Sequence, residues 1–172
     1  GWTPPLGNKT NSKTFFYRTM HCWGWATWAN RWKNYSDNIK LIEKKMNKKK
    51  IYYFNNNGVE NFYWQFLANK KKLTSTWAIF WYLTIYLNKG LCLNPFISFT
   101  KNIGLDGSGE HSKKDRISNM NLKLNDSLYF DFSKKITESN LMFKKIYNYY
   151  KSNNSLKKRI LNKIYFFFKV FS

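Results

Sequence analysis

Dense clusters of aromatic residues constrain the fold of this chain more than any other feature of its sequence. Aromatic side chains make up 20% of the 172 residues and gather in short stretches such as His21–Trp28 and Trp77–Trp81. Large flat rings either fill a core or present stacking surfaces, since both uses need extended apolar area. This much apolar surface excludes disorder driven by low hydrophobicity for most of the chain.

The net charge of +21 leaves two interpretations open. A basic surface attracts the phosphates of nucleic acids, and it would attract an anionic membrane surface or a diphosphate in the same way. Yet the arginines are only Arg18, Arg31, Arg116 and Arg159, and every other basic residue is lysine. Lysine accompanies abundant Asn, Ile, Tyr and Phe, the set favoured by AT-rich codons, so drift on solvated faces also explains much of the charge.

The cysteines and the apolar runs bear on where in the cell the protein is located. Cys22 and Cys92 lack CxxC spacing, which argues against a zinc site or disulfide framework and favours reduced cytosolic thiols. The longest mostly apolar run, Trp77–Leu87, is much shorter than the ~20 residues that a membrane-spanning helix needs. The sequence begins at Gly1 without a signal peptide, so we expect a cytoplasmic chain truncated at its amino terminus.

Hydrophobic spacing and turn residues predict a mixture of helices and short strands. Helix 38–47 has Ser36 and Asp37 as candidate caps, and Thr74–Thr76 is a candidate cap region for helix 77–88. We expect a compact part over 1–132 and a basic helical tail over 133–172. The expected strands are 15–17, 91–93, 97–99 and 128–132; the expected helices are 25–32, 38–47, 58–67, 77–88, 138–151 and 155–171; and 48–57 is expected to be an exposed connection.

Two tryptophan-rich stretches and one glycine-rich stretch carry candidate chemistry. Gly24, between Trp23 and Trp25, indicates a turn or a close backbone approach. Trp77 and Trp81 are four residues apart and share a helix face, where they either pack in a core or stack on sugar rings.

The glycine-rich stretch 104–109 is predicted to be a loop. It contains Asp106 and is followed by Glu110 and His111, which are residue types able to act as a base or to bind a metal. On spacing alone, His111 is either an exposed loop residue or a metal ligand.

Four stretches in this order resemble one lineage of bacterial family 2 glycosyltransferases, the GT-A-fold enzymes of capsule and lipopolysaccharide assembly. They are Cys22–Trp28, Trp77–Trp81, Gly90–Pro95 and Asn102–His111. The resemblance covers residues 1–112 and implies an α/β fold, of which this chain would be the carboxy-terminal, acceptor-binding half. Such an enzyme transfers a sugar from a nucleotide-diphosphate donor to a hydroxyl of a surface polysaccharide or lipopolysaccharide.

The resemblance also implies roles for particular residues. The nucleotide-sugar and a divalent metal, Mn or Mg, would be held mainly by an amino-terminal half that this chain lacks, and no DxD motif occurs here. His111 matches a position that contributes a further metal contact. Ala78 stands where related enzymes often carry an acidic base, which leaves Asp106, Glu110 or a residue of the other half for that role. The implied acceptor-binding residues are Trp23, Gly24, Trp25, Trp77 and Trp81.

Two other interpretations remain, an RNA-binding module and an inactive split-gene remnant. RNA-binding modules usually place their aromatic residues on strands, whereas these tryptophans have helical spacing, so we expect no nucleic-acid partner. In the tail, Ser155–Ser172 combines an apolar stripe with lysines. That helix either packs on its own domain or lies on the anionic inner face of the cytoplasmic membrane, where it would bring a peripheral enzyme to glycan or lipid-linked acceptors.

Overall fold

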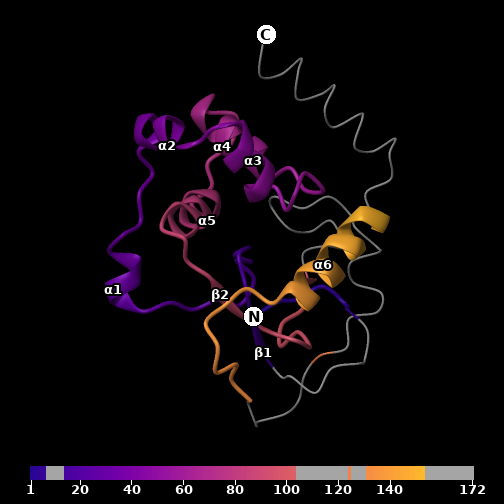
Figure 1. Cartoon of the computed structure of the whole chain (residues 1–172). Coiled ribbons are helices and arrows are strands. Elements are labelled where there is room, and N and C mark those ends of the chain that lie inside the picture. The colour runs from indigo at the N-terminus through magenta and orange to yellow at the C-terminus, as the bar shows by residue number, and fades with distance from the viewer. Residues whose placement is uncertain (7–13, 104–123, 125–130, 154–172) are drawn as a thin grey trace. The chain divides into compact units, whose positions relative to one another are not determined.

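A computed structural model describes residues 1–6, 14–103, 124 and 131–153 of the chain (Figure 1). It combines helices with one small sheet, which confirms a mixed α/β composition. In chain order the elements are β1 (Thr14–Tyr17), α1 (Ala29–Trp32), α2 (Ile39–Lys45), α3 (Lys48–Phe54), α4 (Phe62–Lys70), α5 (Ala78–Leu87), β2 (Cys92–Pro95) and α6 (Asn140–Asn153).

The chain folds into two compact units, each assembled from separate parts of the sequence. Unit 1 consists of Gly1–Thr27 with Leu91–Ile146, and unit 2 of Trp28–Gly90 with Tyr147–Ser172. The division expected at residue 132 stays a prediction, because most of the expected tail lies outside the described residues. Within the described ranges, every helix is too short or too polar to cross a lipid bilayer.

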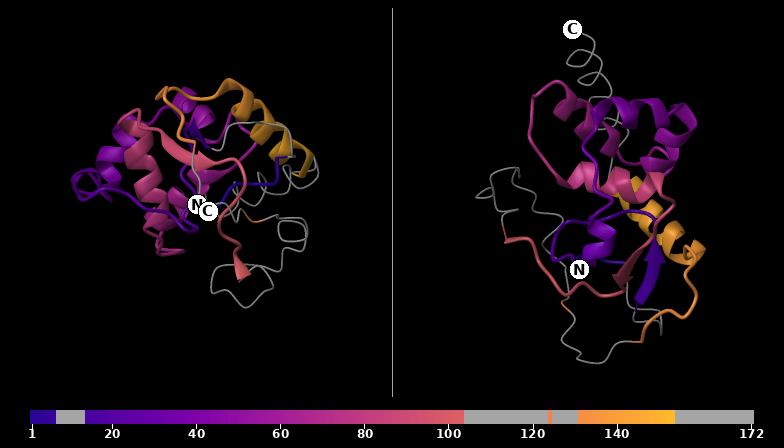
Figure 2. Two further views of the ribbon diagram at one scale, coloured as in Figure 1. Left: turned by 90° about the horizontal axis from the view of Figure 1, so that it is seen from below. Right: turned by 90° about the vertical axis from the view of Figure 1, so that its left-hand side faces the viewer.

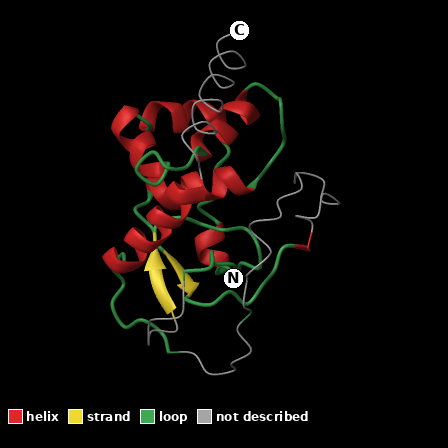
Figure 3. Cartoon of the chain, turned by 90° about the vertical axis from the view of Figure 1, so that its right-hand side faces the viewer, coloured by secondary structure: helices red, strands yellow, loops and turns green. Residues whose placement is uncertain are grey.

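Unit 1 is built on a two-stranded antiparallel sheet, drawn in yellow in Figure 3. β1 pairs with β2 from Thr14 opposite Pro95 to Tyr17 opposite Cys92. Phe15 and Tyr17 alternate along β1 and are both buried, as expected for a strand with one face on a core. The expected strands at 15–17 and 91–93 are therefore confirmed. Residues 97–99 form no strand, and the Phe99 N–H instead donates to the carbonyl of Gly1 at 3.2 Å.

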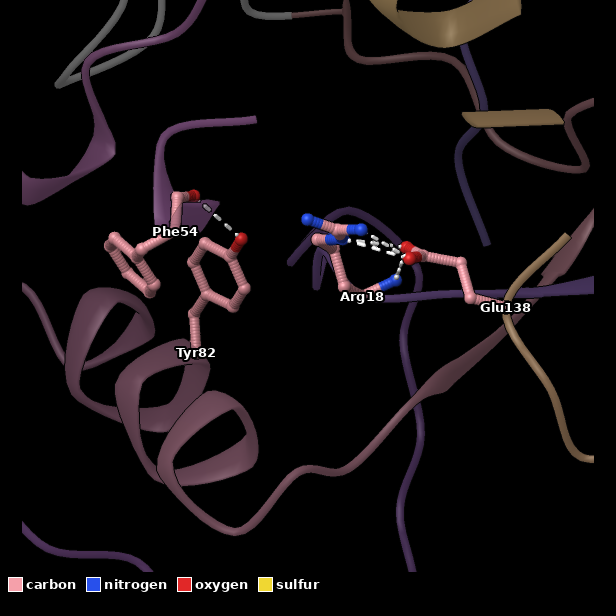
Figure 4. Close-up of polar contacts among 4 residues, drawn as sticks. All are labelled: Arg18, Phe54, Tyr82 and Glu138. Atoms are coloured by element: carbon pink, nitrogen blue, oxygen red, sulfur yellow. Dashed lines mark hydrogen bonds and ion pairs between the residues drawn. The ribbon is translucent and has the colours of Figure 1, made fainter. Parts of the chain in front are cut away.

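A charged pair joins Arg18, which follows β1, to Glu138, which precedes α6 (Figure 4). The Nε of Arg18 donates to both carboxylate oxygens of Glu138, at 2.7 and 3.0 Å, and its guanidinium lies 4.7 Å from the ring centre of Phe143. The Ser139 N–H donates to Phe16 O at 3.0 Å. These contacts place the first half of α6 beside the sheet, as the two views of Figure 2 also show. The helix expected at 138–151 is thus confirmed, whereas the helix expected at 155–171 lies outside the described residues.

Unit 2 is a group of helices around α5. Residues Ile79–Thr84 of α5 are all buried, because other parts of the chain cover this helix on all sides. The ring of Phe54, in α3, stacks on Tyr82 with 4.2 Å between ring centres, and the Tyr82 hydroxyl donates to Phe54 O at 2.9 Å (Figure 4). α5 lies within the range expected at 77–88, which confirms that helix.

The prediction that 48–57 is an exposed connection is wrong, because its first part forms α3. Its lysines and asparagines suggested a low-complexity loop, but the side chain of Asn47 accepts from the Lys50 N–H at 2.9 Å and caps a helix. Ile51 and Phe54, three residues apart, lie on the inward face, and Phe54 is 0% exposed. The prediction failed because the composition of the stretch is polar on average, although one face of α3 is apolar and buried.

Other helix boundaries differ from those predicted. The helix expected at 25–32 is reduced to α1, because Gly24 adopts a left-handed φ of 62° and Trp28 is extended. α2 is capped by Asn38, whose side chain accepts from the Leu41 N–H at 3.0 Å, and not by Ser36 or Asp37. α4 begins at Phe62 instead of Gly58, because residues 56–58 all have positive φ and form a turn. The expected strand at 128–132 lies largely outside the described residues.

Candidate functional site

The first predicted tryptophan stretch lies in unit 1 and packs against the amino-terminal segment. The ring of Trp23 meets Trp2 edge-on at 5.0 Å, and Trp2 meets His21 in the same way at 4.9 Å. The Trp2 N–H donates to Trp23 O at 3.1 Å. Trp23 and Trp25 are both half-buried. In the described part of the chain, Trp23 therefore packs against Trp2 within unit 1.

Gly24 has the conformation that its position between two tryptophans predicts. Its φ is 62°, and a Cβ placed there would overlap the Cγ2 methyl of Thr100. The Thr100 hydroxyl donates to Trp23 O at 3.3 Å. The predicted close backbone approach is confirmed, and it brings the 22–24 segment beside residues that precede the glycine-rich stretch in sequence.

Asp106, Glu110 and His111 lie outside the described residues, so their roles as base and metal ligand stay predictions. Among the residues that the structure describes, no group of three or more His, Cys, Asp or Glu side chains is placed to hold a metal ion. His21 is the histidine that is described. Burial lowers the pKa of His21 to about 4, so its imidazole is neutral near pH 7, and its buried Nε2 has no hydrogen-bond partner among the described residues.

The second predicted stretch lies in unit 2, where Trp77 and Trp81 are joined by a third tryptophan. The ring of Trp32 lies 6.1 Å from that of Trp77 and 4.9 Å from that of Trp81, and it stacks on Tyr35 at 4.9 Å with 25° between the planes. Trp77 is 44% exposed and Trp32 39%, whereas Trp81 is only 4% exposed. We call Trp32, Tyr35 and Trp77 the aromatic platform; Trp81 supports it from within the core.

A groove of about 450 Å³ lies beside the start of α5. Its volume falls within the range of about 300–1,000 Å³ that is usual for small-molecule sites. Ile39, Leu73 and Phe80 contribute apolar surface to it. The polar side chains that line it are Asp37, Asn69, Lys72, Thr74 and Ser75, and we call this the polar groove.

The polar groove and the aromatic platform adjoin through residues 35–37. The Ser36 N–H donates to the hydroxyl of Thr84 in α5 at 3.2 Å, which fixes this segment against the central helix. Burial first, and the negative charge of Asp37 second, raise the pKa of Tyr35. Tyr35 therefore stacks on Trp32 of the platform and also lies close enough to the Asp37 carboxylate of the groove to be affected by its charge.

One side chain organises the wall of the groove, and others are left available to a ligand. Asn69 accepts from the Thr76 N–H at 2.8 Å and donates to the Thr76 hydroxyl at 3.0 Å, so it holds the segment that precedes α5. The hydroxyls of Thr74 and Ser75 and the carboxylate of Asp37 form no hydrogen bond with any residue described in the structure. These three groups can therefore meet the polar atoms of a bound molecule.

Sequence reasoning missed most of these residues. The sequence favours Asp37 and Thr74–Thr76 as helix caps, which is the commoner use of such residues before a helix. Trp32 was placed on a helix face with Trp25 and Trp28, not against Trp77. The sequence does contain a signal for Asp37 as a candidate site residue, since it is one of only 9 acidic residues in a chain with 30 basic ones.

The platform offers an apolar stacking surface, and the groove beside it offers hydrogen-bonding groups. Exposed indole rings stack on the apolar faces of sugar rings, and a carboxylate with neighbouring hydroxyls can accept and donate hydrogen bonds to sugar hydroxyls. No family model, curated protein or solved structure matches this chain.

Proposed function

We propose that this chain is the acceptor-binding part of a sugar-nucleotide-dependent glycosyltransferase and that the aromatic platform and polar groove of unit 2 hold the saccharide acceptor. The observation that carries the proposal is the exposed ring of Trp77, held by Trp32 beside a groove that contains the Asp37 carboxylate. The order of the four sequence motifs supports the enzyme class, and the platform supports a carbohydrate ligand.

In the proposed reaction, an acceptor hydroxyl attacks the anomeric carbon of a nucleotide-diphosphate sugar. The new bond joins the acceptor oxygen to that carbon, the bond from the carbon to the diphosphate oxygen breaks, and the hydroxyl proton passes to a carboxylate base. The negative charge that develops on the diphosphate is what a divalent metal such as Mn or Mg would stabilise. Asp106 and Glu110 remain the proposed bases, with His111 as a proposed metal contact.

The acceptor, by resemblance, is a capsular or lipopolysaccharide glycan assembled at the inner face of the cytoplasmic membrane. Within this proposal the residues of the platform have distinct tasks. Trp77 and Trp32 would stack on sugar rings, whereas the buried Trp81 would hold Trp32 in place. Trp23 and Trp25 of unit 1 remain proposed acceptor residues.

The proposal is tested by saccharide binding to the full chain. Short oligosaccharides of hexoses and N-acetylhexosamines are titrated while the indole N–H signals are followed by NMR. Trp77→Ala should weaken binding about tenfold, a loss of about 1.4 kcal/mol, because the stacking surface is removed. Asp37→Asn should weaken binding as well, since an amide replaces one of the accepting oxygens by a donor.

Trp28→Ala is the matched control. Trp28 belongs to the same unit and is 77% exposed, but no ring contact joins it to the platform. Its removal should leave saccharide affinity unchanged. Equal weakening by the Trp77 and Trp28 variants, or no signal change with any saccharide, would contradict the proposal. Binding of single-stranded RNA that depends on Trp77 and falls steeply with salt would favour the nucleic-acid class instead.

A further inference from the structure

The surface of α2 and α3 concentrates positive charge, and in the described part of the chain the carboxylate that α2 carries is already paired. The lysines at the end of α2 and the start of α3 are all exposed: Lys44, Lys45, Lys48, Lys49 and Lys50. Glu43 is the carboxylate within α2, and it is already paired with Lys70 of α4 at 2.5 Å. The five lysines therefore present an electropositive surface to any anionic partner.

Exposed apolar side chains share this surface with the lysines. On α2, Leu41 is 42% exposed and lies three and four residues before Lys44 and Lys45, which places all three on one helix face. On α3, Tyr52 is 51% exposed and has the same spacing from Lys48 and Lys49. Tyr53 is exposed beside Tyr52, with 5.5 Å between ring centres.

The two helices are held to one another and to the centre of unit 2. The Lys50 ammonium donates to Lys45 O at 2.7 Å and so joins the start of α3 to the end of α2. Two tyrosines of α5 anchor α3, because the Tyr86 hydroxyl donates to Lys50 O and the Tyr82 hydroxyl to Phe54 O, both at 2.9 Å. The exposed lysines and apolar side chains are therefore presented on a fixed support.

The combination of lysines with exposed leucine and tyrosine matches one anionic partner best. Lysine ammonium groups attract lipid phosphates, while leucine and tyrosine side chains enter the boundary between headgroups and acyl chains. A nucleic acid would provide phosphates, but it offers no apolar layer for Leu41, and this surface has no arginine to form paired contacts with phosphate. We propose that α2 and α3 form a surface that binds anionic phospholipid membranes. This inference does not depend on the proposed enzymatic activity.

Co-sedimentation with vesicles tests the proposed membrane surface. The full chain is mixed with vesicles of phosphatidylcholine, with or without phosphatidylglycerol, at several salt concentrations. The test variant changes Lys44, Lys45, Lys48 and Lys49 to Glu. The control variant changes four exposed lysines of unit 1 to Glu, so that the net charge is the same: Lys101, Lys134, Lys135 and Lys144.

We expect the wild-type chain to sediment only with vesicles that contain phosphatidylglycerol. The test variant should bind these vesicles at least about tenfold more weakly, whereas the affinity of the control variant should change much less. Leu41→Ser with Tyr52→Ser should lower the binding that persists in high salt, which a purely electrostatic contact would not explain. Equal thermal melting curves establish that the variants are folded.

Three results would overturn the proposal. Equal losses in the test and control variants would mean that only the net charge matters. Unchanged binding in the test variant would assign membrane binding to another part of the chain, such as the sequence-predicted interfacial helix 155–171. Loss of single-stranded RNA binding with intact vesicle binding in the test variant would assign this surface to nucleic acid. Failure of saccharide binding at the platform would leave the membrane proposal untouched, so the two proposals fail separately.

Discussion

Removal of two similar hydroxyl groups from α5 measures how much the buried contact between α3 and α5 stabilises unit 2. Tyr82 and Tyr86 both donate to main-chain carbonyls of α3 at 2.9 Å, so the two hydrogen bonds have the same length. They differ in burial, because the bond from Tyr82 to Phe54 O is buried and the bond from Tyr86 to Lys50 O is exposed. The variants Tyr82→Phe and Tyr86→Phe therefore form a matched pair.

The expected magnitudes follow from what happens to the carbonyl left behind. Without the Tyr82 hydroxyl, water has poor access to Phe54 O, and a buried acceptor without its partner costs about 1–3 kcal/mol. Without the Tyr86 hydroxyl, water can replace the donor at Lys50 O, so the loss should be about 0.5 kcal/mol. Both rings stay in place, which leaves the stacking of Phe54 on Tyr82 intact.

Urea denaturation of the full chain, followed by far-ultraviolet circular dichroism, measures both changes in the free energy of unfolding. The denaturant midpoint should fall clearly for Tyr82→Phe and little for Tyr86→Phe, with the slope unchanged in both. Equal destabilisation by the two variants would refute the reasoning, because it would mean that Phe54 O is as accessible to water as Lys50 O. A larger effect of Tyr86→Phe would also refute it.

Two further predictions concern unit 1. Burial lowers the pKa of His21 to about 4, whereas the pKa is about 6.5 in the unfolded chain, so the unfolded state takes up the proton more readily. The free energy of unfolding should therefore be highest above pH 6.5. It should fall by up to about 3 kcal/mol as the pH drops towards 4. Urea midpoints measured across this range should lose that part of their pH dependence in His21→Phe, and an unchanged pH dependence would contradict the assignment. Gly24→Ala should destabilise the chain by about 1–3 kcal/mol, because alanine is strained at a φ of 62° and its methyl overlaps Thr100. Thermal melting should show partial recovery when Thr100→Ser removes the overlapping methyl, whereas a neutral Gly24→Ala would show that the close approach is absent.

Several elements could be predicted because their signals are local. The aromatic run that forms β1, the apolar segment within α5 and the helix α6 are all recognisable, since residue spacing alone shows which face can be buried. Gly24 was interpreted correctly for the same reason. A glycine between two bulky residues indicates a backbone conformation that other residues rarely adopt.

Other features could not be predicted because they depend on contacts between distant residues. The lysines and asparagines of α3 resemble a loop in composition, and only the stacking of Phe54 on Tyr82 shows that one face of this stretch is buried. The tryptophans before α1 have helical spacing, yet Trp28 is extended and Gly24 has a left-handed φ, because the backbone at Trp23 and Gly24 packs against the distant Thr100.

The candidate site shows most clearly what sequence and tertiary structure each decide. Sequence by itself determined that Trp77 and Trp81 share one face of a helix, because they are four residues apart. Only the tertiary structure decided that Trp81 is buried while Trp77 remains exposed and meets the ring of Trp32. Spacing determines which side chains of a helix point the same way. Their exposure, and the groups around them, depend on which other segments pack against that face.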